Sequence, residues 1–127
     1  MALPHPYQQY RQQQVNTASP EKLLLMLFDG ALRFGRIAVK CLQEKQQETA
    51  HLNLLKTQNI VEELMGSLNH DYEIAQNLYT LYDYMHRRLI EANIKKDPAI
   101  VEEVLGLLAE LRETWAETAL KLHEGAV

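Results

Sequence analysis

Apolar residues recur at intervals of three and four along four long stretches of the 127-residue chain. An α-helix turns about 100° per residue, so this spacing gathers them on one side of a helix. Two stretches begin with a potential capping residue followed by proline, at Ser19-Pro20 and Asp97-Pro98. The pattern predicts helices at about residues 20–43, 49–67, 72–95 and 98–122.

The arrangement of these helices follows from the segments between them. No stretch sustains the alternation of apolar and polar residues that is typical of a strand. The breaks between the predicted helices are short, so neighbouring helices should be antiparallel. We therefore expect an all-α fold with a single domain over residues 1–127. Its architecture is an antiparallel up-down four-helix bundle with an irregular N-terminal tail at residues 1–18.

The first predicted helix is apolar on two sides. One seam consists of Leu23, Leu27, Phe34, Ala38 and Cys41. A second seam consists of Leu25, Phe28, Leu32 and Val39. The polar residues are confined to a sector of roughly 60°. A bundle core needs an apolar arc of about 100° or somewhat more from each helix, and this helix offers over twice that.

The third predicted helix also has apolar residues outside its core stripe. The stripe consists of Leu78, Tyr82, Met85 and Leu89. The additional residues are Tyr79, Tyr84, Ile90 and Ile94. Two explanations of the extra seams stay open. The helices are more buried than usual or lie under a loop, or the seams form a surface for an apolar partner.

The N-terminal tail leads into the first helix through "YQQYRQQQVNTASPEK", from Tyr7 to Lys22. This segment has no apolar stripe, and its large anchors are Tyr7, Tyr10 and Val15. A tyrosine ring can pack on an apolar surface while its hydroxyl stays hydrated. The tail therefore fits a weakly held cover over an apolar seam.

Composition narrows the class of protein. A net charge of −4 argues against a nucleic-acid partner or an anionic membrane surface. One cysteine excludes an internal disulfide and fits a reducing compartment. The N-terminus lacks the apolar core of a signal peptide, and no apolar run approaches the ~20 residues of a membrane span. We expect a cytoplasmic protein without membrane insertion.

Candidate catalytic and metal-binding residues are few. Glu48-x-x-His51 has the spacing found in di-iron bundles, and Asp83-x-x-His86 is close to it. Such a site also needs an inward carboxylate from each other helix, and Asp29 lies in the polar sector of its helix. No phosphate-binding glycine loop or nucleophile elbow occurs. We expect no catalytic residue, no metal, no cofactor and no enzymatic activity.

Three segments carry a family resemblance: "YQQYRQQQVNTASPEKLLLMLFDGALRF", "AQNLYTLYDYMHRRLIEANIKKD" and "LLAELRETWAE". They resemble the flagellar secretion chaperone family, FliS, from about Tyr7 to Trp115. Phe28 stands where the family more often has tyrosine, which removes a hydroxyl but keeps the ring. The linker from Gln46 to His51 and the far C-terminus match weakly.

The resemblance implies a cytoplasmic chaperone in bacterial flagellum biogenesis and type III protein export. Its client would be flagellin, whose disordered C-terminal segment wraps around the bundle and gains helix there. Binding would prevent premature polymerisation and assist delivery to the flagellar export gate, a possible second partner. The family's N-terminal segment folds over part of the bundle and moves when flagellin binds.

This function assigns roles to the extra apolar residues. The predicted partner-binding residues are Leu25, Phe28, Leu32, Val39, Tyr79, Tyr84, Ile90 and Ile94. The predicted lid residues are Tyr7, Tyr10 and Val15. An alternative is a helical-bundle interaction protein whose extra seam closes a homo-oligomer and which has no folding client. A weak homodimer without cargo would also cover the seam.

Overall fold

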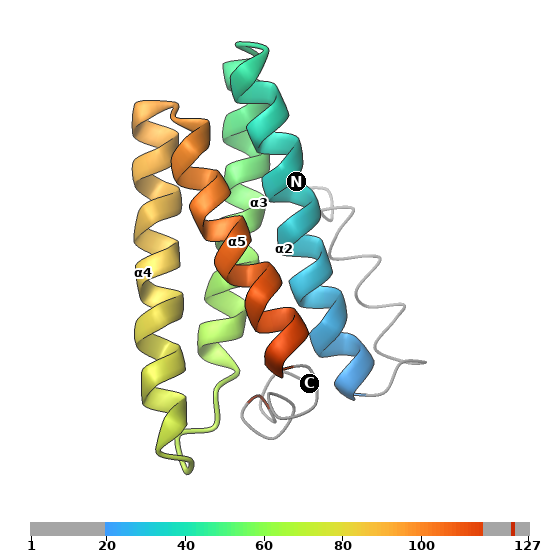
Figure 1. The fold of residues 1–127 in the computed structure, drawn as a ribbon, viewed down its shortest axis with the longest axis vertical. Helices are drawn as coiled ribbons and strands as arrows, with labels where there is room; N and C mark the ends of the chain where they lie inside the picture. The colour runs from blue at the N-terminus through green and yellow to red at the C-terminus, as the bar shows by residue number, and fades with distance from the viewer. Residues whose placement is uncertain (1–19, 116–122, 124–127) are drawn as a thin grey trace, which may run out of the picture.

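The computed structural model describes residues 20–115 and His123, and this part of the chain contains helices and no strand (Figure 1). The helices are α2 (Pro20–Gln43), α3 (Gln47–Gly66), α4 (Ile74–Lys95) and α5 (Pro98–Trp115). They pack lengthwise into a bundle, which confirms the predicted all-α class. The predicted tail at residues 1–18, and residues 116–122 of the fourth predicted helix, lie outside the described residues.

Short turns reverse the chain between consecutive helices. After α2, the amide of Gln46 donates to the carbonyl of Cys41 at 2.8 Å, and Lys45 has a left-handed φ of 59°. Lys96 ends α4 with a φ of 52°. The Asp97 carboxylate then accepts from the amide of Ala99 at 2.9 Å, which is the capping role that the Asp-Pro pair predicts.

Two helices begin at positions that differ from the expected ones. The helix α3 begins at Gln47, two residues before the expected start, and no side chain caps it. The helix α4 begins at Ile74 because the preceding residues form a turn. In that turn the amide of Tyr72 donates to the carbonyl of Asn69 at 3.2 Å.

Each helix packs against two neighbours. The helix α2 contacts α3 and α5, and α4 contacts the same two helices from the opposite side (Figure 1). The core between them contains fully buried side chains from every helix, among them Leu24, Leu54, Tyr82 and Leu108. The phenol of Tyr82 lies 3.1 Å from Nε2 of His123, which is also buried.

Gly35 lets α5 approach α2 closely. A Cβ atom at this position would overlap Cδ2 of Leu105. The absence of a side chain therefore brings the backbone of α2 against a leucine of α5. This contact holds one side of α2 directly against α5.

Candidate functional site

The second apolar seam of α2 is largely inside the bundle. Phe28 is 1% exposed and Leu32 is 5% exposed, and both belong to the same core as Leu27. Leu25 and Val39 are half-buried. Of the two explanations left open by the sequence, the burial of Phe28 and Leu32 favours a helix that is more buried than usual. Contact of these four residues with a client stays a prediction.

The neighbouring helix α5 explains this burial. Gly35, which shares a side of α2 with Phe28 and Leu32, faces Leu105 of α5. Further round the same side, Asp29 forms an ion pair with Arg112 of α5. The opposite side of α2 faces α3, where the ammonium of Lys56 lies 5.1 Å from the ring centre of Phe34. One apolar seam of α2 therefore packs against α5, and the other packs against α3.

Tyr84, predicted to bind a partner, lies at the junction of α4 and α5. Its hydroxyl donates to Oε2 of Glu103 at 2.7 Å, and Nε of Arg88 donates to Oε1 of the same carboxylate at 2.9 Å. The hydrogen bond to Glu103 raises the pKa of Tyr84, and the bonds from Tyr84 and Arg88 lower the pKa of Glu103. Tyr84 therefore links two helices through its hydroxyl.

The other predicted residues of α4 are exposed. The exposed fractions are 38% for Tyr79, 39% for Ile90 and 77% for Ile94. The structure adds Leu52 and Leu55 of α3, which are 53% and 38% exposed. Neither leucine is among the binding residues predicted from the sequence, although their three-residue spacing indicates a second apolar line on α3.

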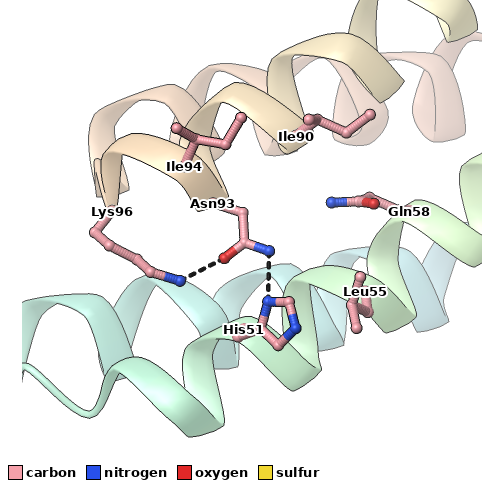
Figure 2. Close-up of a pocket in the computed structure, with 7 residues that line it drawn as sticks. All are labelled: His51, Leu55, Gln58, Ile90, Asn93, Ile94 and Lys96. Carbon is pink, nitrogen blue, oxygen red and sulfur yellow. Dashed lines mark hydrogen bonds between the residues drawn. The ribbon is translucent and has the colours of Figure 1, made fainter.

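A surface hollow of about 350 Å³ lies between α3 and α4 (Figure 2). We refer to it as the α3–α4 hollow. Its lining residues are His51, Leu55, Gln58, Ile90, Asn93, Ile94 and Lys96. It therefore brings together two predicted residues, Ile90 and Ile94, but not Tyr79 or Tyr84.

A hydrogen bond between Asn93 and His51 joins the two helices at one end of the hollow. The amide of Asn93 lies between Nδ1 of His51, at 2.7 Å, and the ammonium of Lys96, at 2.6 Å (Figure 2). A second contact between the same helices joins Nε2 of His86 to Glu62 at 2.8 Å. Around the axis of α4, Asn93 and His86 lie closer to the core of the bundle than Ile94 does.

The described residues form no candidate metal centre. Residues 20–115 with His123 contain no group of three or more His, Cys, Asp or Glu side chains suited to holding a metal ion. Both histidines of the Glu-x-x-His and Asp-x-x-His motifs are engaged, His51 with Asn93 and His86 with Glu62. Cys41 is buried. None of the described helices is long and apolar enough to cross a membrane.

The fold and this surface are typical of a helical-bundle protein that binds another polypeptide. A four-helix bundle with exposed isoleucine and leucine side chains around a hollow between two helices presents a surface of the kind that receives a helical segment. The lid residues predicted on the tail, Tyr7, Tyr10 and Val15, lie outside the described residues.

Comparison with known proteins identifies the family. The family model described as "Flagellar protein FliS" matches residues 3–122, so the chain belongs to the FliS family. It is 42% identical over 117 residues to the flagellar secretion chaperone FliS of Bacillus subtilis (strain 168), covering 92% of this chain and 88% of that one. The FliS chaperone of Escherichia coli (strain K12) is 39% identical over 109 residues, covering 84% of this chain and 80% of its own.

A third relative agrees with these two. The flagellar secretion chaperone FliS of Salmonella typhimurium (strain LT2) is 40% identical over 111 residues, covering 84% of this chain and 82% of its own. The resemblance found in the sequence is thereby confirmed. FliS proteins form a chaperone family and not an enzyme family, so the expectation of a non-enzyme is confirmed as well.

Proposed function

We propose that this protein is a cytoplasmic export chaperone whose client is flagellin. It binds the disordered C-terminal segment of the client, prevents premature polymerisation and assists delivery to the flagellar type III export apparatus. The names of the relatives support the chaperone role. The structural observation that carries the proposal is the exposure of Ile94, at 77%, beside Ile90 on α4.

The physical demands on such a chaperone fit this surface. A filament subunit keeps sticky terminal segments because they assemble against one another later. An apolar surface between helices can hold such a segment as a helix in a groove. The segment orders only on binding, so the free energy of binding is moderate for the area covered. Moderate affinity suits a cargo that must be released for export.

The structure favours α4 with α3 over α2 as the main client surface. Ile90 and Ile94 are accessible together with Leu52 and Leu55. Phe28 and Leu32 are inside the core, so a client would reach them only after the bundle rearranged. We therefore place the first contact of the client at the α3–α4 surface.

The test uses flagellin with and without its C-terminal segment. The immobilised protein should retain full-length flagellin and should lose it when the segment is removed. A peptide of the segment should gain helix on mixing, as measured by far-ultraviolet circular dichroism. Equal retention of both flagellins would contradict the proposal. A concentration-dependent mass without any client binding would favour the homo-oligomer instead.

A further inference from the structure

Gln58 has an unusual environment in the α3–α4 hollow. Its side chain is 8% exposed, and no hydrogen bond joins its amide to another described residue. Figure 2 shows the amide directed toward the space between the two helices. The described residues contain no side-chain nitrogen or oxygen atom that is both buried and without a hydrogen bond, so the amide of Gln58 is open to water in the hollow. The amide of Gln58 is therefore a polar group that the described part of the protein leaves available.

Two neighbours on α3 show that this is a property of the position and not of the helix. The amide of Asn53 donates to the carbonyl of Thr49 at 2.9 Å. The hydroxyl of Thr57 donates to the carbonyl of Asn53 at 2.9 Å. Both side chains are buried and both are satisfied within α3. Gln58 instead extends into the hollow, where water or a ligand can reach it.

The polar end of the hollow presents hydrogen-bond donors. An ammonium can only donate, so the oxygen of Asn93 accepts from Lys96 and the nitrogen of Asn93 faces Nδ1 of His51. In this arrangement the Asn93 amide nitrogen donates to Nδ1 of His51. The Lys96 ammonium keeps further N–H groups, and Gln58 offers its amide N–H groups.

The lining of the hollow carries positive charge and no negative charge. Lys96 is the single formally charged residue among the lining residues, and the lining contains no carboxylate. Within the described residues Lys96 forms no ion pair, and its partner is the neutral amide of Asn93. The adjacent Lys95 is instead paired with Glu91 at 2.9 Å. A positive end beside apolar walls is complementary to an acidic, apolar segment.

We propose that the α3–α4 hollow binds one turn of a client helix that carries an apolar side chain and a carboxylate three or four residues away. The apolar side chain packs between Leu55, Ile90 and Ile94, and the carboxylate pairs with Lys96. Positions three and four apart lie on one side of a helix, so both groups reach the hollow together. Gln58 donates to a polar group of the same turn.

This inference rests on the proposed function, since it names the chemistry by which the client is chosen. Its test is a binding titration with a peptide of the flagellin C-terminal segment. The protein variants are Lys96→Gln and Gln58→Leu, and the matched control is Lys95→Gln. The first two should weaken binding about three- to fivefold while keeping the parental melting temperature. The control should bind like the parent.

Peptide variants identify the partner of Lys96. Each Asp or Glu of the peptide is replaced in turn by Asn or Gln, and one replacement should weaken binding as Lys96→Gln does. That replacement should have no further effect on the Lys96→Gln protein. Loss that follows only amidation of the peptide's C-terminus would assign Lys96 to the chain end and overturn the side-chain assignment.

The outcomes separate the two proposals. If the parent protein does not bind the peptide, the flagellin client and the role of the hollow both fall. If the parent binds and the Lys96→Gln and Gln58→Leu proteins bind equally well, only the assignment of the hollow is overturned. Weaker binding by both variants but not by Lys95→Gln supports it.

Discussion

The extra apolar residues of α2 and of α4 look alike in the sequence and differ in the bundle. Phe28 and Leu32 of α2 are buried in the core, whereas Ile90 and Ile94 of α4 are 39% and 77% exposed. The two helices have the same pair of neighbours, α3 and α5. The difference therefore does not arise from how many helices surround each one.

Polar contacts between helices account for the difference. On α2, the ion pair of Asp29 with Arg112 lies farther from the core than Phe28 and Leu32 around the helix axis. On α4, the hydrogen bond from Asn93 to His51 lies closer to the core than Ile90 and Ile94. Charged and amide groups at the hydrated edge of an interface can pair without the desolvation cost of full burial. Apolar residues inside that edge are core, and those beyond it are surface.

Charge substitutions give the strongest test of this boundary between core and surface residues. Leu32→Glu should largely unfold the protein, because an unpaired charge in a packed core costs several kcal/mol of a total stability of roughly 5–15 kcal/mol. Ile90→Glu should stay helical and melt within a few degrees of the parent, because its charge remains hydrated. Thermal melts followed by circular dichroism compare them, with Leu27→Glu as the core reference. A parental melt for Leu32→Glu would contradict the boundary.

Client binding distinguishes the exposed surfaces. Ile90→Glu should weaken flagellin binding at least tenfold, which requires a loss of only about 1.4 kcal/mol. The matched control is Ile37→Glu on α2, since Ile37 is 37% exposed and lies outside the α3–α4 hollow. Titration with the C-terminal peptide measures both. Equal affinities for the two variants would show that the client surface lies elsewhere.

The close approach of α2 and α5 can be broken at Gly35. Gly35→Val should lower the free energy of unfolding by about 1–3 kcal/mol, because the new side chain overlaps Leu105. Adding Leu105→Ala should restore part of the loss. The control Gly106→Ala meets no atom within 4 Å and should stabilise α5 by up to about 1 kcal/mol. Urea unfolding measures all three, and a Gly35→Val protein as stable as the parent would exclude close packing here.

Tyr82, on the inner side of α4, should have no effect of this kind at neutral pH and should act only in alkaline solution. Burial raises the pKa of Tyr82 well above its ordinary value of 10.0. A raised folded pKa favours the protonated fold, so its contribution to stability is complete below pH 10 and is lost as the pH rises above it. The loss should approach about 1.4 kcal/mol per pH unit. Urea unfolding should show this slope in the parent and a flatter one in Tyr82→Phe. An equal slope in both proteins would contradict it.

Much of the fold was predictable from the sequence because it depends on local spacing. The core stripe of α4, with Leu78, Tyr82, Met85 and Leu89, is buried as its periodicity predicted. The turn at Asp97 follows from a capping side chain next to proline. Membership of the FliS family follows from long motifs in order. These features need no knowledge of which helix lies beside which.

Tertiary packing decided which apolar residues face water. The angular order of residues around one helix was available from the sequence, but the place where a neighbouring helix stops covering it was not. That limit is set by contacts between distant positions, such as Asp29 with Arg112 and His51 with Asn93. For the same reason the α3–α4 hollow, with Gln58 directed into it, appears only once two helices are packed together.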